Sequence, residues 1–238
     1  MTAPHAIVLA GPGTNREPDT ALALHLAGAE PTVHLVGDVT ANPALLDRAA
    51  IIVIAGGFSY GDALGAGRLL ALDLELALHD QLAHFIDRGG LVLGICNGFQ
   101  VLTRAGLLPG SLGHNDHGAF ICDWVQLAVD SDSTCVWTRS IDAEIHAPIA
   151  HGEGRWTHPD PAGVAASGQI ALRYSGSNPN GSLDNVAGVC DATGRVLGLM
   201  PHPENHAVAR QHPLAGRIDP AAHLGLRLFT NAVEYARG

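Results

Sequence analysis

The sequence predicts an α/β fold with a doubly wound, mostly parallel sheet and an antiparallel β extension. The first observation is that short aliphatic runs alternate with segments of helical period as far as Gly110, a pattern typical of a parallel sheet covered by helices. The second is that the run 51–54 contains only isoleucine and valine, as expected for a strand buried on both faces. The third is that shorter β-rich runs, separated by Asp, Ser, Pro and Gly, follow Gly110.

Local signals justify the elements of the first half in turn. Asn42 and Pro43 suit the cap and first turn of a short helix. Gly89 and Gly90 end a long segment of helical period, and Gly106 stops the next one. The predicted strands are residues 6–10, 32–36, 51–54 and 91–95. The predicted helices are residues 19–29, 42–48, 68–88 and 99–105.

The second half contains mostly short strands. Residues 191–194, Asp-Ala-Thr-Gly, join two apolar runs, which predicts a hairpin. A final segment of helical period closes the chain. Because neither an internal repeat nor a linker is visible, we predict a single domain over residues 1–238. The predicted strands are residues 120–129, 141–149, 170–174, 186–190 and 195–200, and the closing helix is residues 220–235.

The composition is that of an ordered globular protein. Apolar residues make up 47% of the chain and charged residues 15%, which excludes a disordered class. The apolar runs are too short to span a bilayer, and no signal peptide is recognisable, so no membrane association is expected. Cys96, Cys122, Cys135 and Cys190 are widely spaced, which predicts free thiols in a cytoplasmic protein. We expect the last three to be buried packing residues.

The formal net charge of −10 also limits the possible functions. All 13 basic residues are arginines and are scattered singly, so no nucleic-acid partner is expected. The absence of lysine removes Schiff-base chemistry and the lysine of a phosphate-binding loop. Residues 11–13, Gly-Pro-Gly, therefore predict a simple turn. His114 and His117, with Asp116 between them, are too weak a pattern for zinc. We expect a solvated loop there and no metal site.

The most informative segment is residues 94–100, Gly-Ile-Cys-Asn-Gly-Phe-Gln. An apolar run that enters Gly-x-Cys-x-Gly and continues into a helix predicts a strand, a sharp turn and a helix. Such a turn exposes a nucleophile at the end of a sheet, as the serine nucleophile elbow does. Cys96 would lie at the N-terminus of the helix, where the helix dipole favours a thiolate.

A cysteine nucleophile needs a base, and the base needs an orienting group. Among the 14 histidines, His202 follows the apolar run 196–200 and therefore also lies at a strand end. Glu204 is two residues further on, on the same side of an extended chain, and can orient His202. The loop 55–62 follows another strand to the same edge of the sheet. Its adjacent glycines free backbone N–H groups for a developing oxyanion.

These segments together resemble a known family. Residues 94–100 and the Pro-His-Pro-Glu segment at 201–204 resemble the class I (triad) glutamine amidotransferases, which have a flavodoxin-like fold. Within that family the chain is similar to the purine branch, the glutaminase subunit of phosphoribosylformylglycinamidine synthase. Several separate matches in the expected order are more specific than one motif. The further matching segments are residues 56–62, 96–102, 105–110, 150–155 and 178–182.

The resemblance implies a role for each site residue. Cys96 would attack the carboxamide of L-glutamine and form a γ-glutamyl thioester. His202 would protonate the departing ammonia and then activate water, while Glu204 holds its tautomer. The backbone N–H groups of Gly57 and Asn97 would form the oxyanion hole.

The resemblance also implies a substrate contact and partners. Gln100 would contact the bound glutamine. Ammonia would pass to a separate synthetase subunit, which converts formylglycinamide ribonucleotide to formylglycinamidine ribonucleotide in purine biosynthesis. A small bridging subunit is a further implied partner. No cofactor is expected in this chain, because ATP and Mg²⁺ would bind to the synthetase.

Some features stay open at this stage. Ala55 stands where the family usually has proline, and Asn205 and His206 replace Arg-Ala, a departure that bears on partner contacts. His151 either belongs to the glutaminase–synthetase interface or caps a turn. Residues 178–182 either belong to the family pattern or only form a turn. Two other functions are a free-standing cysteine hydrolase of γ-glutamyl compounds or peptides, and a catalytically idle regulatory module on the same fold.

Overall fold

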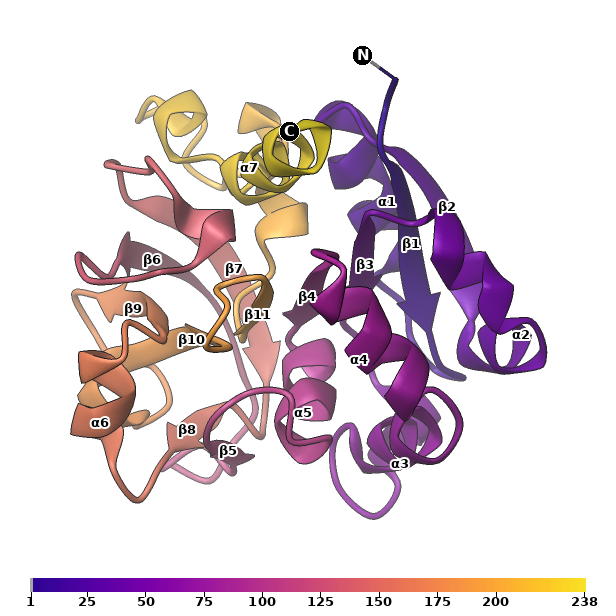
Figure 1. Ribbon diagram of the computed structural model, residues 1–238. Helices are drawn as coiled ribbons and strands as arrows, with labels where there is room; N and C mark the ends of the chain where they lie inside the picture. Colours follow the sequence, from indigo (N-terminus) through magenta and orange to yellow (C-terminus); the bar gives the residue numbers. More distant parts are fainter. Residues whose placement is uncertain (1) are drawn as a thin grey trace.

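Five parallel strands form the half of the sheet that leads to Cys96 (Figure 1). The computed structural model describes residues 2–238. The strands lie in the order β2-β1-β3-β4-β11, and each pairs with its neighbours in parallel. The doubly wound, mostly parallel arrangement is therefore confirmed. The strand bounds are β1 (His5–Ala10), β2 (Glu30–Leu35), β3 (Ile51–Ile54), β4 (Leu91–Ile95) and β11 (Val196–Leu199).

The predicted β extension continues the same sheet rather than forming a second one. Beyond β11 the order is β10-β9-β6-β7, with antiparallel pairing throughout, which gives nine strands in all. The predicted hairpin is confirmed as β10 and β11. A separate two-stranded sheet pairs β5 (Ser111–Gly113) with β8 (Arg155–Thr157). The remaining bounds are β6 (Ile121–Val129), β7 (Ile145–His151), β9 (Ile170–Ser175) and β10 (Val186–Cys190).

Helices cover both faces of the parallel strands (Figure 1). The connection from β1 to β2 runs one way along the sheet and that from β3 to β4 the other. Because such crossovers are right-handed, their helices lie on opposite faces. Helix α1 (Glu17–Leu26) packs with α7 (Leu226–Arg237), whereas α3 (Arg68–Ala77), α4 (His79–Asp87) and α5 (Asn97–Arg104) lie together on the other side.

The remaining helical elements are short. Two are α-helices, α2 (Val36–Ala41) and α6 (Pro161–Ala166). Asp160 caps α6, since its Oδ1 accepts a hydrogen bond from the Gly163 N–H at 2.9 Å, and Pro161 follows in the first turn. The Asp-Pro pair at 160–161 is therefore a local sequence signal for the start of α6. The 3₁₀ turns are Pro43–Arg48, Ser59–Asp62, Val136–Thr138, Leu183–Asn185, Pro203–His206, Ala209–Gln211 and Pro220–His223.

Three predicted elements were wrong in extent. The helix expected over 68–88 is two helices, because Leu78 leaves the helical region at φ −132° and its side chain is fully buried. The core contact of Leu78 thus overrides its own helix preference. The closing helix begins at Leu226 rather than at residue 220. The strand expected over 141–149 begins at Ile145 and runs to His151.

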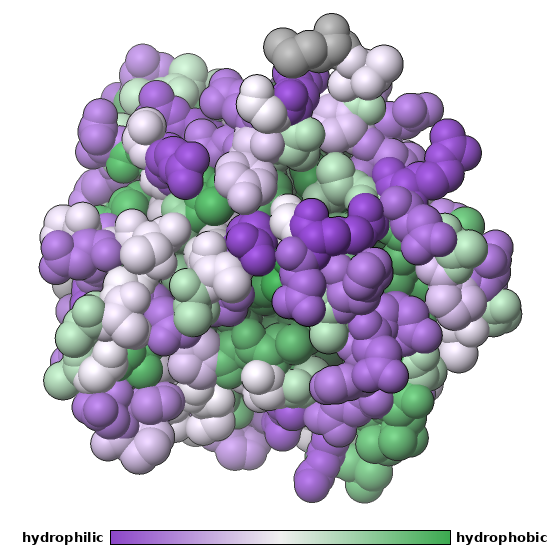
Figure 2. Space-filling view, viewed as in Figure 1, coloured by the Kyte–Doolittle hydropathy of each residue, from purple (hydrophilic) through white to green (hydrophobic). Residues whose placement is uncertain are grey.

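The surface mixes polar and apolar side chains, as Figure 2 shows for one face. Hydrophobic side chains gather at the lower right of that view, over α3. Leu72 and Leu76 are exposed residues of this helix. Within residues 2–238 no helix combines the length and the apolar character that crossing a membrane requires.

The turn after β4 is packed backbone against backbone. A Cβ atom on Gly98 would lie 2.1 Å from the carbonyl oxygen of Ile54, the last residue of β3. A Cβ atom on Gly94 would lie 2.6 Å from the carbonyl carbon of Gly98. Only glycine therefore lets α5 begin this close to β3 and β4.

The Gly98→Ala variant should be less stable than the parent protein by roughly 1–3 kcal/mol, because α5 must move away from β3 to admit the methyl group. The measurement is the free energy of unfolding from urea titrations. Gly37→Ala is the control, since no atom lies within 4 Å of a Cβ atom there and Gly37 lies in α2. A Gly98→Ala protein as stable as the control would contradict the packing described here.

Candidate active site

Cys96 forms the sharp turn between β4 and α5. Its backbone has φ 49° and ψ −99°, a strained conformation for a residue with a side chain. The Cys96 N–H donates to the Leu199 carbonyl at 2.8 Å, which ties the turn to the end of β11. The predicted strand, turn and helix around this cysteine is confirmed, with the geometry of a nucleophile elbow.

His202 and Glu204 form a buried pair directly after β11. His202 Nδ1 lies 2.7 Å from Glu204 Oε1, and the two side chains are almost inaccessible to solvent. The His202 N–H donates to the Pro148 carbonyl at 2.8 Å, which fixes the backbone of this segment against β7. Pro203 follows His202 as the first residue of a short 3₁₀ turn. The structure thus brings together the histidine and the carboxylate as predicted.

The charge of His202 depends on its two acidic neighbours. Burial lowers the pKa of His202, but the Glu204 carboxylate and the Cys96 thiolate outweigh this effect, and the net pKa is about 10. Glu204 also hydrogen-bonds to the imidazole through its Oε1. His202 is therefore a cation at neutral pH, stabilised by the negative charges of Glu204 and Cys96.

The loop after β3 carries a glycine with a conformation that other residues rarely adopt. Gly57 has φ 139°, and a Cβ atom there would lie 2.7 Å from the backbone nitrogen of Asn15. The carbonyl of the preceding Gly56 accepts a hydrogen bond from the Arg16 N–H at 3.3 Å. Within residues 2–238 the Gly57 and Asn97 N–H groups have no hydrogen-bond acceptor. Both donors are thus free in the region of Cys96.

Gln100 is engaged by the protein at both ends of its side-chain amide. Its Oε1 accepts from Asn97 Nδ2 at 3.0 Å, and its Nε2 donates to the Glu153 carbonyl at 2.6 Å. Asn97 Oδ1 in turn accepts from the Ser59 N–H at 3.4 Å. These hydrogen bonds connect the turn at Ser59, the first turn of α5 and the loop at Glu153. Gln100 lines the same cavity as Cys96, and its contact with substrate stays a prediction.

A cavity of about 180 Å³ opens onto Cys96. This volume is below the roughly 300–1,000 Å³ typical of sites for drug-sized ligands, so it suits a small molecule. Sequence reasoning missed several of its polar residues, among them Asp62 and Glu153. The lining residues are Gly57, Phe58, Asp62, Ala66, Cys96, Gln100, His114, Phe120, Ala150, His151, Gly152 and Glu153.

His151 lines this cavity, which neither of its two predicted roles anticipated. Asn115 Nδ2 donates to the Ala119 and His151 carbonyls, so Asn115 Oδ1 must be an acceptor, and it lies 3.0 Å from His151 Nδ1. His151 Nδ1 therefore carries the proton and Nε2 carries a lone pair. Burial and the neighbouring His202 charge lower the pKa of His151 to about 4. This histidine is neutral at pH 7.

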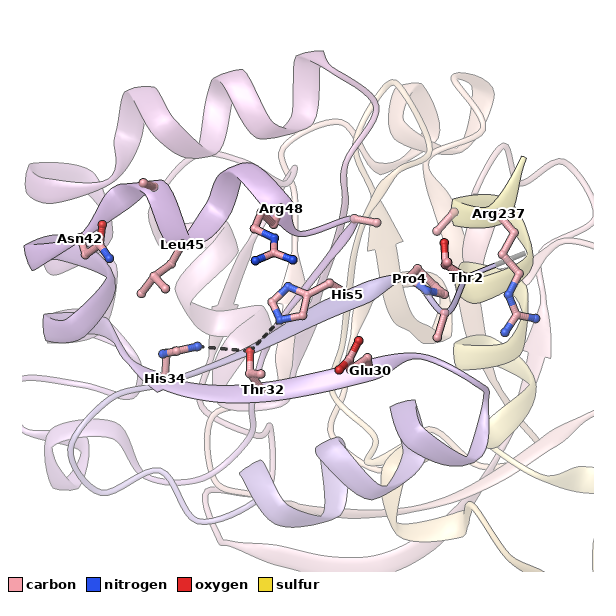
Figure 3. Close-up of a pocket in the computed structure, with 14 residues that line it drawn as sticks. Thr2, Pro4, His5, Glu30, Thr32, His34, Asn42, Leu45, Arg48 and Arg237 are labelled. Atoms are coloured by element: carbon pink, nitrogen blue, oxygen red, sulfur yellow. Dashed lines mark hydrogen bonds between the residues drawn. The ribbon is translucent and has the colours of Figure 1, made fainter.

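A larger depression, of about 940 Å³, lies beside β2 at the opposite edge of the sheet (Figure 3). His5 and His34 each lie 3.2 Å, through Nε2, from the Thr32 hydroxyl. None of the predicted site residues lines it. Volume alone therefore does not identify the active site, whereas the nucleophile and its charged neighbours do.

Other sequence expectations had mixed outcomes. Cys135 and Cys190 are buried, but Cys122 is exposed on β6, so its assignment as a packing residue was wrong. His206 is fully buried and bonds through Nδ1 to the His146 carbonyl at 2.7 Å, so it offers no surface to a partner. Within the described part of the chain, no three His, Cys, Asp or Glu side chains are placed to hold a metal ion.

Taken together, the groups around Cys96 suit acyl transfer through a thioester. A thiol at a helix N-terminus supplies the nucleophile, and the adjacent imidazolium supplies a proton. The Gly57 and Asn97 N–H groups, which have no acceptor among residues 2–238, are available to stabilise an oxyanion.

Comparison with known proteins agrees with this chemistry. Phosphoribosylformylglycinamidine synthase subunit PurQ of Treponema denticola is 42% identical over 244 aligned residues, which cover 87% of this chain and 90% of the relative. The protein of the same name from Dehalococcoides mccartyi is 40% identical and covers 100% of this chain and 99% of its own. A chain in the structure of PurLQS from Thermotoga maritima superposes with a TM-score of 0.80 at 36% identity, over 98% of this chain and 99% of that one.

These matches confirm the resemblance to the glutaminase subunit of phosphoribosylformylglycinamidine synthase. The family comparison extends over nearly the whole sequence, since residues 3–236 match a single family. The chain belongs to the CobB/CobQ-like glutamine amidotransferase domain family.

Proposed function

We propose that this chain is the glutaminase subunit of phosphoribosylformylglycinamidine synthase and releases ammonia from L-glutamine. The observation that carries the proposal is the strained turn that presents Cys96 to the buried His202–Glu204 pair. Relatives that bear the name of this synthase subunit support the choice of glutamine as substrate and of purine biosynthesis as the pathway.

In the first half of the reaction, the Cys96 thiolate attacks the carboxamide carbon of glutamine. The new C–S bond pushes negative charge onto the carboxamide oxygen, which the Gly57 and Asn97 N–H groups receive. The tetrahedral intermediate then collapses, the C–N bond breaks, and His202 gives its proton to the departing nitrogen. Ammonia leaves, and a γ-glutamyl thioester stays on the sulfur.

In the second half, water attacks the thioester and transfers a proton to His202. The C–S bond breaks, and glutamate leaves as the thiolate reforms. The hydrogen bond to Glu204 keeps the imidazole in one orientation through both halves. Gln100 holds Asn97 and the backbone at Glu153 in place, so its proposed contact with glutamine adds to a positioning role.

The ammonia then passes to a separate synthetase, which uses it to amidate formylglycinamide ribonucleotide. The Thermotoga maritima structure is named PurLQS, with one letter for each of three subunits. This name supports an assembly of the chain with a synthetase and a small bridging subunit. We propose that ATP and Mg²⁺ bind to the synthetase and that this chain needs no cofactor or metal. Free thiols and a buried reactive cysteine suit a cytoplasmic location. One continuous sheet across both halves supports a single domain over residues 1–238.

The Cys96→Ser variant should lose glutamine-dependent synthesis by a factor on the order of 10⁴–10⁶, because His202 is already protonated at neutral pH and cannot take the proton of a serine hydroxyl. Synthesis from ammonium chloride by the same reconstituted complex should be unchanged, since the synthetase step does not use Cys96. The measurement is the rate of formylglycinamidine ribonucleotide formation with each nitrogen source.

Cys122→Ser is the matched control, because Cys122 is exposed on β6 and lies outside the cavity. It should keep both activities. Equal loss of both activities in Cys96→Ser would show that Cys96 is structural. Rapid glutamine hydrolysis by the isolated chain, as fast as by the full assembly, would instead favour a free-standing hydrolase.

His202 and His151, the two histidines near Cys96, should have pKa values on opposite sides of neutral pH. Nitrogen-15 NMR at pH 7 should find His202 as an imidazolium and His151 as a neutral ring, in line with pKa values of about 10 and about 4. The pKa of His202 should fall in the Glu204→Gln variant, because the carboxylate that mainly raises this pKa is absent.

The raised pKa of His202 also predicts how the free energy of unfolding depends on pH. The folded pKa of His202 lies above the ordinary value of 6.5, so its contribution is complete below about pH 6.5 and is lost as the pH rises toward 10. The difference in unfolding free energy between the parent protein and Glu204→Gln should therefore be larger at pH 6 than at pH 10. A difference that does not change with pH would refute the charged state of His202.

A further inference from the structure

The cavity at Cys96 holds a carboxylate without a counter-charge. Asp62 lines the cavity, and among residues 2–238 its side chain makes neither an ion pair nor a hydrogen bond. Its Oδ1 is inaccessible to solvent and unpartnered. Burial and the neighbouring Glu153 raise the pKa of Asp62, as expected for an acid with no cation beside it.

The arrangement of the loop holds Asp62 at this place. Asp62 has φ 54°, in the left-handed region, and its carbonyl accepts a hydrogen bond from the Gly65 N–H at 2.9 Å. It closes the short 3₁₀ turn that begins at Ser59, whose N–H bonds to the Asn97 side chain next to the nucleophile. The strained backbone thus carries an acid into the same cavity as the sulfur.

Glu153 is the second acid of the cavity, and it differs from Asp62 in having a partner. Its Oε2 lies 3.6 Å from Arg104, which also donates to the Ala66 carbonyl. Since Arg104 forms its ion pair with Glu153, Asp62 is the carboxylate of the cavity without a cation beside it. A desolvated charge of this kind is costly unless a ligand pairs with it.

A second unpartnered acceptor lines the same cavity and follows directly on a residue that contacts the sulfur. His151 is 3% exposed, and its Nε2 has no partner. The residue before it, Ala150, places its carbonyl 3.8 Å from Cys96 Sγ. The cavity therefore offers unsatisfied hydrogen-bond acceptors at Asp62 and at His151, and a ligand that fills it needs N–H donors at two separate positions.

Glutamine has donors at both of its ends, the γ-carboxamide and the α-ammonium group. The carboxamide must lie at Cys96 for reaction, so the α-ammonium group is the donor left for an acid away from the sulfur. We infer that Asp62 binds the α-ammonium group of the substrate, with Glu153 adding negative charge, and so selects an α-amino acid over an amide that lacks the amino group. This inference rests on the proposed glutaminase function and names the specificity residue of that site.

The test compares two substrates in the complete synthase complex. One is glutamine, and the other is glutaramate, which has the same carboxamide and carboxylate but no α-ammonium group. In Asp62→Asn, kcat/KM for glutamine should fall by roughly 10–100-fold, the value of a lost charge-assisted hydrogen bond. Most of the change should lie in KM, and kcat/KM for glutaramate should change little. The parent complex should therefore prefer glutamine far more strongly than the variant does.

Asp73→Asn is the matched control. Asp73 lies on α3 and accepts a hydrogen bond from Tyr60 of the same loop, but it does not line the cavity. It should keep the preference of the parent complex. Ammonia-dependent synthesis, measured in every variant, reports whether the complex is intact, and Asp62→Glu should recover part of the preference.

Each outcome decides a different question. An equal fall for both substrates in Asp62→Asn, or no fall for either, overturns the assignment of Asp62 while leaving the glutaminase function in place. A parent complex that makes product from ammonia but not from glutamine overturns the proposed function itself.

Discussion

The active site depends on the close approach of backbones where β4 turns into α5. Gly94 and Gly98 have no side chains, so α5 begins in contact with the end of β3. The residue between them, Cys96, must then adopt a positive φ, and the surrounding sheet holds it there through the bond to Leu199. The sulfur is presented by backbone constraint rather than by a flexible side chain, which is how strained residues are maintained at reactive sites.

Hydrogen bonds extend this constraint from the turn to the loops around it. Asn97 and Gln100 form a chain that begins at the Ser59 N–H and ends at the Glu153 carbonyl. Since these groups come from the turn after β3, the first turn of α5 and the loop after β7, they tie together segments that are far apart in the sequence. A movement of the loop that carries Gly57 would therefore also displace the first turn of α5, which carries Asn97.

The electrostatics of the site follow from burial and from which neighbours are charged. His202 and His151 are both buried near Cys96, yet one has a raised and the other a lowered pKa. The difference lies in the negative charges of Glu204 and Cys96, which act on His202 and not on His151, whose partner is the neutral amide of Asn115. Two buried histidines near the same sulfur therefore have different protonation states, and only His202 can donate a proton at neutral pH.

The sequence by itself determined the parallel sheet, the nucleophile turn and the pairing of His202 with Glu204, because hydrophobic period, glycine spacing and adjacent residues are local properties. Local signals failed where core contacts decided the outcome: Leu78 interrupts a segment of helical period because its side chain is buried. The cavity was also beyond local reasoning, because Asp62 comes from one family-like segment and His151 and Glu153 from another, and only the fold brings the two segments to one cavity. Only the tertiary structure decided which acid has a cation and which does not, because pairing depends on distances across the fold rather than along the chain.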